Sequence, residues 1–135
     1  MTSSANLDLV RSIFTARERG DFSSAEWADQ EIEYVFADGP SPGTFTGLAG
    51  MAEAMRESLS AWEGFHLHVD EYRELDDERV LVLLHARGRG KRSGLELDAL
   101  SDQGAQIVHV REGKVTRIVV YFDRDRALAD LGLTP

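Results

Sequence analysis

Three side chains combine a capacity for proton transfer with apolar surroundings in the sequence. Asp98 lies within an apolar strand pattern, and His85 follows the apolar run 80–84. A carboxyl group in an apolar wall has a raised pKa and can exchange protons with a ligand. An imidazole titrates near neutral pH, so it can act as a general acid or base. With Tyr34, which alternates with charged residues in a predicted strand, Asp98 and His85 are the candidate catalytic residues.

Each candidate also has a purely structural interpretation. His85 could lie at the end of its strand on the outer face of a sheet or at a dimer surface. Asp98 could be an exposed strand residue paired with an arginine such as Arg87. If their strands are neighbours, Asp98 and His85 could form an acid–base pair, but the sequence does not define the strand register.

Other polar motifs point less clearly to chemistry. His66 and His68 share one strand face, but a third ligand is not evident, so we predict no metal site. The basic, glycine-rich segment 87–94 could bind an anion or form a solvated loop. The second interpretation fits the charge balance, because residues 1–78 carry 17 acidic and 5 basic side chains. Asp123 is predicted to cap the closing helix.

The composition limits the classes of function. The chain has 135 residues and a net charge of −9, which suits one domain over 1–135 and argues against nucleic-acid binding. It contains no cysteine, which excludes disulfides, thiolate metal sites and cysteine nucleophiles. No apolar stretch is long enough for a membrane span, and we expect a cytoplasmic protein.

The hydrophobic spacing predicts an α+β fold in which helices precede strands. Asn6 is predicted to cap a first helix that stops near Gly20, and Thr46 to cap a long helix that ends at Gly64. The remaining predicted elements are a short helix over 23–29, strands over 31–37, 65–70, 80–86, 95–110 with a bulge at 101–104, and 114–122, and a closing helix over 123–131.

This order of elements resembles the NTF2-like superfamily, and within it the SnoaL-like polyketide-cyclase and ketosteroid-isomerase relatives. The most family-like stretches are 87–94, 111–115 and 121–124. The resemblance implies a cone-shaped fold, with a curved antiparallel sheet wrapped around the long helix and additional N-terminal helices. It also implies a mainly apolar internal pocket and a homodimer through the outer sheet face. The run 80–84, apolar on both faces, is consistent with both expectations.

The catalytic residues of ketosteroid isomerases do not carry over to this chain. Counting from Gly113 places the acidic oxyanion donor at Gln106, and the general-base aspartate falls near Phe36. The oxyanion-binding tyrosine falls near Ile13 or Phe14. Strand alternation then defines the pocket. The predicted ligand-binding residues are Phe14, Trp27, Tyr34, Phe36, Trp62, Gln106, Val108, Ile118 and Phe122.

These observations predict a SnoaL-like domain that binds a small, largely hydrophobic molecule in an internal pocket. Catalysis would be a cofactor-free proton transfer of the isomerase or cyclase type, because a positioned acid and base need no cofactor. The alternative is a non-catalytic ligand-binding or dimerisation module, which the missing isomerase residues favour.

Overall fold

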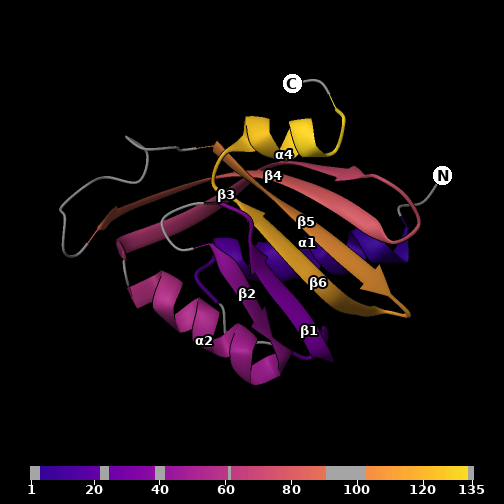
Figure 1. Cartoon of the computed structure of the whole chain (residues 1–135), viewed down its shortest axis with the longest axis horizontal. Coiled ribbons are helices and arrows are strands. Elements are labelled where there is room, and N and C mark those ends of the chain that lie inside the picture. Colours follow the sequence, from indigo (N-terminus) through magenta and orange to yellow (C-terminus); the bar gives the residue numbers. More distant parts are fainter. Residues whose placement is uncertain (1–3, 22–24, 39–41, 61, 91–102, 134–135) are drawn as a thin grey trace.

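The computed structural model describes residues 4–21, 25–38, 42–60, 62–90 and 103–133 (Figure 1). Side chains of residues 58–60, 62–65 and 88–90 are outside this description. In chain order the elements are α1 (Ala5–Glu18), β1 (Ala28–Phe36), β2 (Gly43–Thr46), α2 (Gly47–Ser60), β3 (Trp62–Glu74), β4 (Arg79–Gly90), β5 (Gln103–Arg111), β6 (Lys114–Tyr121) and α4 (Arg124–Asp130).

The strands form one curved six-stranded sheet in the order β2-β1-β6-β5-β4-β3. Neighbouring strands are antiparallel except β1 and β6, which run parallel with Tyr34 opposite Ile118. The predicted α+β class and curved sheet are therefore confirmed. The parallel pair was not predicted, because strand alternation gives the facing of residues but not the partner of a strand.

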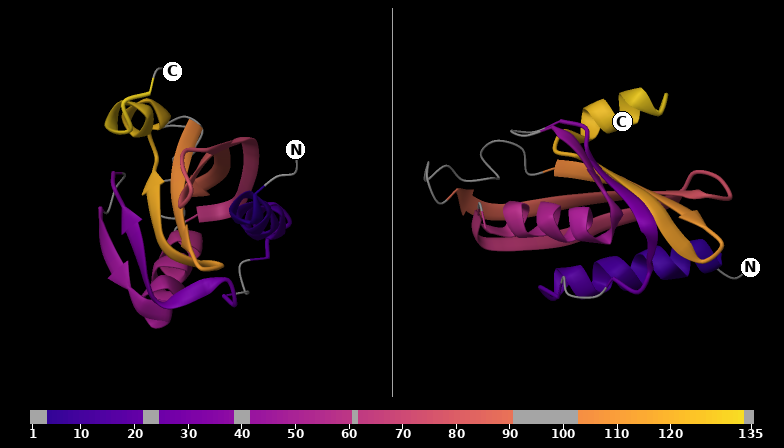
Figure 2. Two further views of the ribbon diagram at one scale, coloured as in Figure 1. Left: turned by 90° about the vertical axis from the view of Figure 1, so that its right-hand side faces the viewer. Right: turned by 60° about the horizontal axis from the view of Figure 1, so that its bottom comes forward.

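Helices cover both faces of the sheet, and each face has its own core (Figure 2). We call the face under α1 and α2 the inner face and the face under α4 the outer face. Val80, Val82 and Leu84 belong to the inner core, whereas Leu81 and Leu83 pack with α4 in the outer core. The predicted double coverage of the run 80–84 is thus confirmed, and within the described chain α4 provides the outer cover.

The first helix begins two residues earlier than predicted. Ser4, not Asn6, is the N-cap, and its side chain accepts a hydrogen bond from the backbone N–H of Leu7. Val10, Ile13, Phe14 and Arg17 form the buried stripe of this helix. The prediction chose Asn6 because it lies next to the first apolar residue, but Ser4 has the three-residue spacing that capping requires.

Three other predictions about the elements are wrong. Instead of a helix over 23–29, the described residues form a turn at 26–27 and then β1 from Ala28. Helix α2 ends at Ser60, so Trp62 lies in β3 rather than on the helix. The short strand β2 was predicted as loop and helix cap. It forms by antiparallel pairing with β1, a tertiary contact that outweighs local propensity.

The turns and the closing helix agree with prediction. Glu112 and Gly113 have φ values of 53° and 78°, which suit the tight hairpin between β5 and β6. The Asp123 side chain accepts hydrogen bonds from the backbone N–H groups of Asp125 and Arg126, and so caps α4. The pairs between β4 and β5 from Arg79–His109 to His85–Gln103 are regular. The rest of the predicted strand 95–110, including Asp98, lies outside the described residues.

Candidate functional site

The inner face contains one buried amide whose oxygen lacks a hydrogen-bond partner. Gln106 lies in β5, between Val82 of β4 and Val120 of β6. The residue is only 8% exposed, and within the described chain its Oε1 atom accepts no hydrogen bond. Its strand neighbours belong to the inner hydrophobic core, so Gln106 is a polar group in an apolar wall. Leaving a buried acceptor unsatisfied costs about 1–3 kcal/mol.

The second polar group inside the inner core is an arginine. Arg17 is 4% exposed, and its guanidinium carbon lies 5.4 Å from the ring centres of both Phe14 and Trp27. Its Nη2 atom also lies 3.9 Å from the sulfur of Met55 on α2. The guanidinium thus sits where α1, the turn before β1 and α2 meet. Aromatic faces stabilise a cation through the ring quadrupole.

The residue after Arg17 fixes the end of α1 to the sheet. The Oε2 atom of Glu18 accepts a 2.9 Å hydrogen bond from the backbone N–H of Val69 in β3. The same oxygen lies 3.4 Å from Nδ1 of His68. Because successive helix residues point about 100° apart, anchoring Glu18 at the sheet edge directs Arg17 into the interior.

Aromatic side chains form the wall contributed by β1 and β2. Tyr34 is 4% exposed, its ring centre is 5.5 Å from that of Phe36, and Phe36 meets Phe45 edge-on at 6.0 Å. Most of the predicted ligand-binding residues lie in or against this inner core: Phe14, Trp27, Tyr34, Phe36, Val108, Ile118 and Phe122. The side chain of Trp62 is outside the description. The predicted inward alternation of β1, β5 and β6 therefore matches the structure.

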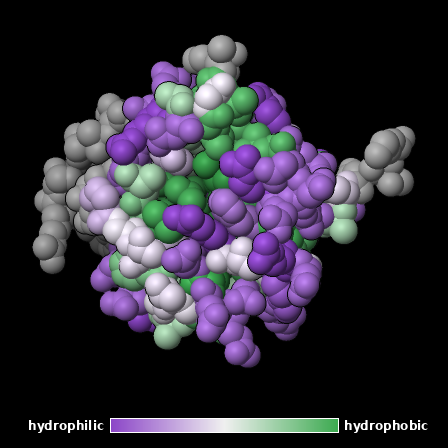
Figure 3. Space-filling model, turned by 45° about the vertical axis from the view of Figure 1, so that its right-hand side comes forward, coloured by the Kyte–Doolittle hydropathy of each residue, from purple (hydrophilic) through white to green (hydrophobic). Residues whose placement is uncertain are grey.

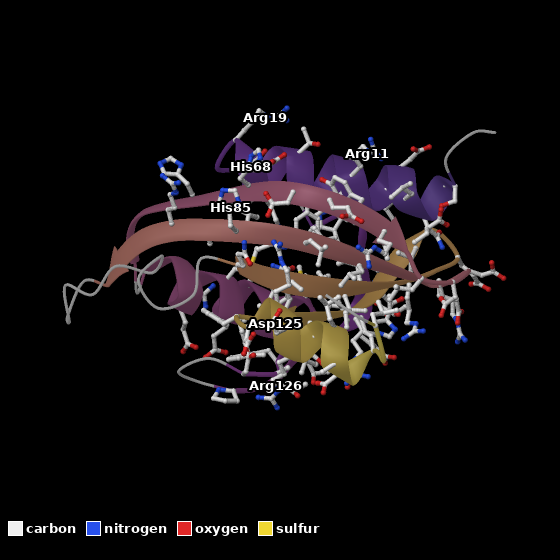
Figure 4. The ribbon with its side chains drawn as sticks, turned by 90° about the horizontal axis from the view of Figure 1, so that it is seen from above. Arg11, Arg19, His68, His85, Asp125 and Arg126 are labelled. Carbon is white, nitrogen blue, oxygen red and sulfur yellow. The ribbon has the colours of Figure 1, made fainter. Side chains whose placement is uncertain are left out.

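His85 does not line the inner face. It shares the outer side of β4 with Leu81 and Leu83, whereas Tyr34 belongs to the inner core. His85 Nδ1 lies 3.0 Å from Asp70 Oδ1, and its ring centre is 5.0 Å from that of His68 (Figure 4). The structure thus places the candidate catalytic residues His85 and Tyr34 on opposite faces, and the acidic partner of His85 in the described chain is Asp70.

Asp70 reaches this position through a bulge in β3. The pairing of β3 with β4 shifts between Val69 and Glu71, which leaves Asp70 as the extra residue. Arg124 at the start of α4 donates from Nη2 to Asp70 Oδ2 and to the backbone oxygen of Leu84, both at 2.8 Å. Burial favours a raised pKa for Asp70, but the hydrogen bond from Arg124 and the charge of His85 outweigh it. The pKa of Asp70 is consequently lowered.

Two other polar motifs of the sequence, the histidine pair in β3 and the basic segment 87–94, form no recognisable site in the described residues. Within them, no three histidine or acidic side chains are grouped as a metal site would require. His66 and His68 lie opposite Arg87 and His85 in the pairing of β3 with β4. Strand β4 continues through Gly90, so the first part of the segment 87–94 is strand rather than hairpin loop. Residues 91–94 lie outside the described chain.

Sequence reasoning missed Arg17, although a signal for it existed. Arg17 lies three residues after Phe14 and seven after Val10, on the apolar stripe of the first helix. A charged residue at such a position is a candidate for a buried functional group. Asp70 and Arg124 were missed for a different reason, because their contact depends on a bulge that local pattern does not reveal.

The chain matches a known protein family over most of its length. The sequence model of that family, described as the SnoaL-like domain, covers residues 10–118. The chain belongs to the SnoaL-like domain family. An uncharacterized protein of Mycobacterium tuberculosis is 27% identical over 125 residues, which cover 90% of this chain and 92% of that protein.

Solved structures show the same fold. An NTF2-like protein from Burkholderia thailandensis has a TM-score of 0.76 and 19% identity, covering 99% of this chain and 100% of the other. TerC, co-crystallized with polyporic acid, has a TM-score of 0.72 and 22% identity, covering 96% and 98%. Putative polyketide cyclases and a ketosteroid isomerase-like protein also resemble this SnoaL-like domain. These likenesses confirm the predicted fold, and the family match over residues 10–118 confirms the predicted family.

Among the described helices, none combines the length and the hydropathy that a membrane-spanning helix needs.

Proposed function

We propose that this SnoaL-like domain binds a small, largely hydrophobic molecule on the inner face of its sheet. The ligand would carry a hydroxyl group, either phenolic or enolic, that donates a hydrogen bond to Gln106. Phe14, Trp27, Tyr34 and Phe36 would contact its apolar body. Apolar walls with a few converging polar groups suit such ligands.

The observation that carries this proposal is the unpartnered oxygen of Gln106. A buried acceptor without a donor lowers stability by about 1–3 kcal/mol, and a ligand hydroxyl would remove this penalty on binding. TerC, which has a similar fold, was co-crystallized with polyporic acid.

Cofactor-free proton transfer of the isomerase or cyclase type is the catalytic form of this proposal. Tyr34 is the proposed acid or base on the inner face. Asp98, which lies outside the described residues, remains a proposed catalytic residue. A non-catalytic binding module is the alternative. It is favoured by the placement of His85 on the outer face and by Phe36 and Gln106 at positions where the isomerases have acidic residues.

We also propose a homodimer through the outer face. Because α4 covers part of this face, a second copy would contact the part beside α4. Leu81, Leu83 and Ile107 are already packed under α4. Figure 3 shows a band of hydrophobic residues that runs down from the region of α4 between polar side chains. The partly buried residues of the outer core, among them Val119, Leu131 and Leu133, are the apolar residues that a second copy would cover.

The hydroxyl proposal is tested with two naphthalene probes that differ in one methyl group on the oxygen. Titration calorimetry compares 2-naphthol with 2-methoxynaphthalene, which lacks the donor. We expect the wild-type protein to bind 2-naphthol roughly tenfold more tightly, the equivalent of one good hydrogen bond. Gln106→Met keeps the side-chain size but removes the acceptor, so it should abolish this preference.

Gln30→Met is the matched control, because it makes the same chemical change at an exposed position of β1. It should leave the preference for 2-naphthol intact. Equal affinity of the wild-type protein for both probes, or an unchanged preference in Gln106→Met, would contradict the proposed role of Gln106. Failure of both probes to bind would contradict the ligand-binding function itself.

A further inference from the structure

We propose that His109 is an acid-sensitive switch on the outer face, in which protonation of its imidazole destabilises the sheet where β4, β5 and β6 meet. The inference is independent of the ligand proposed for the inner face. It rests on the position of His109 between two arginines, one on each neighbouring strand. It assigns a role to a histidine that neither the candidate site nor the proposed function uses.

Four side chains form a row across the outer face, at the end of the sheet that carries the hairpin between β5 and β6. Arg79 of β4 lies directly opposite His109, and His109 lies directly opposite Arg117 of β6. Arg117 is in turn opposite Glu33 of β1. Because side chains alternate along a strand, His109 shares its face with Ile107 of the outer core.

The charge of this row depends on the protonation state of His109. Guanidinium groups keep their charge at any physiological pH, but an imidazole gains a proton in mild acid. Protonation therefore changes two separated cations into three adjacent ones, and like charges directly opposite each other destabilise paired strands. Because His109 is partly buried, water compensates the new charge only in part.

The carboxylates closest in sequence to the row are engaged with arginines. Asp76 Oδ2 accepts a 2.7 Å hydrogen bond from Nε of Arg79, and Glu78 Oε2 accepts one of 3.1 Å from Nε of Arg111. The backbone N–H of Glu78 and the guanidinium of Arg79 lower the pKa of Asp76, so Asp76 stays ionised in mild acid. In the described chain, neither carboxylate is paired with His109.

The other elements around the row supply no carboxylate for the imidazole among the described residues. Glu33 of β1 lies 3.8 Å from Arg117. Helix α4 packs on the apolar part of the outer face, where Asp130 accepts a hydrogen bond from Tyr121, four residues after Arg117. A protonated His109 thus faces an arginine on each side and gains no acidic partner of its own.

These surroundings lower the pKa of His109. Burial is the largest cause, the charges of Arg117 and Arg79 come next, and Asp76 and Glu78 offset only part of the effect. The unfolded chain, in which histidine has a pKa near 6.5, therefore takes up the proton first as the pH falls. The stability that the neutral imidazole permits is complete above about pH 6.5 and is lost as the pH falls through the folded pKa.

Urea unfolding at pH 7.5 and pH 5.5 tests the switch by comparing the wild type with His109→Gln, which is neutral at both pH values. The unfolding equilibrium constant of the wild type should rise severalfold between the two conditions relative to that of the variant. His66→Gln is the matched control, because it makes the same change at an exposed histidine of β3. This control should show the pH dependence of the wild type.

Nuclear magnetic resonance gives a second readout, the titration of the His109 imidazole in the folded protein. Arg117→Met removes the charge of one opposite neighbour and should raise the pKa of His109. Arg126→Met removes the same charge from an exposed position of α4 and should leave that pKa unchanged (Figure 4). This titration decides the question if His109→Gln does not fold.

The outcomes either support or overturn the switch. A loss of stability in acid that is larger in the wild type than in His109→Gln supports it, as does a pKa of His109 that rises in Arg117→Met alone. An equal loss of stability in the wild type and His109→Gln would overturn the proposal. So would titration of His109 in the folded wild-type protein at or above the pH of 6.5 that is usual for histidine.

Discussion

Two arginines show how differently the same side chain can be used in this molecule. Arg124 donates to the carboxylate of Asp70 and to the backbone oxygens of Leu84 and Gly104. These contacts fasten the start of α4 to β4 and β5, which is a structural role. Arg17 instead lies against aromatic rings and a thioether inside the inner core. Arg17 thus joins α1 to the inner core, whereas Arg124 joins α4 to the sheet.

The contact between Asp70 and Arg124 predicts a pH-dependent stability. Because the pKa of Asp70 is lowered in the folded protein, its contribution is present above the unfolded pKa near 4. The contribution is lost as the pH falls through the folded pKa. Asp70→Asn should lower the free energy of unfolding by about 1 kcal/mol at pH 7. This difference from wild type should shrink below about pH 4.

Urea unfolding at a series of pH values measures this effect. Glu53→Gln, at an exposed position of α2, is the control and should change stability by less than about 0.5 kcal/mol at any pH. A destabilisation by Asp70→Asn that stays constant down to pH 2.5 would show that the carboxylate charge is not the cause.

At the scale of elements, the contact between β5 and β6 depends on a residue without a side chain. A Cβ atom at Gly104 would lie 2.8 Å from the backbone oxygen of Tyr121, closer than real Cβ contacts allow. The neighbouring Tyr121 also ties β6 to α4, because its hydroxyl donates to Asp130 at 2.8 Å. Burial and this bond to Asp130 raise the pKa of Tyr121 to about 12.

Gly104→Ala should consequently destabilise the protein by about 1–3 kcal/mol, because either β5 or β6 must shift. Thermal and urea unfolding measure the loss. Gly43→Ala provides the comparison, since an added Cβ in β2 meets no atom within 4 Å. That variant should be neutral or slightly stabilising. Equal stability of the two variants would contradict the close approach of β5 and β6.

The sequence predicted elements where the local signal and the tertiary context agree. The apolar run 80–84, the turn at Glu112 and the cap at Asp123 are cases in which spacing or residue type dictates the local structure. The start of β1, strand β2 and the parallel pairing of β1 with β6 depend on contacts between distant segments. Periodicity carries no information about such partners.

The same distinction between local signals and contacts of distant segments applies to the candidate site. The family resemblance and strand alternation predicted the inward position of Gln106, and the structure adds that its oxygen is unpartnered. The sequence left the facing of His85 open, and the register of β4 decides it. Arg17 was overlooked because charged residues are usually read as exposed, even on an apolar stripe. The approach of Asp70 to Arg124 could not be predicted, since it requires a bulge.

The charge of the whole molecule sets which ligands can approach the inner face. The chain carries a net charge of −9, so an organic anion is repelled over long range. A neutral compound with a hydroxyl group, the class proposed here, meets no such repulsion. Salt screens charge–charge interactions and leaves the hydrogen bonds and apolar contacts of a neutral ligand nearly unchanged.

This difference predicts how salt acts on binding. Between about 0.01 M and 0.1 M NaCl the Debye length falls from about 30 Å to about 10 Å. The association constant for 2-naphthol, which is neutral at pH 7, should stay within about twofold over this range. Titration calorimetry at both salt concentrations measures this. An affinity that falls severalfold with salt would mean that a solvent-exposed charged group holds the ligand, and the buried amide of Gln106 would then be the wrong residue.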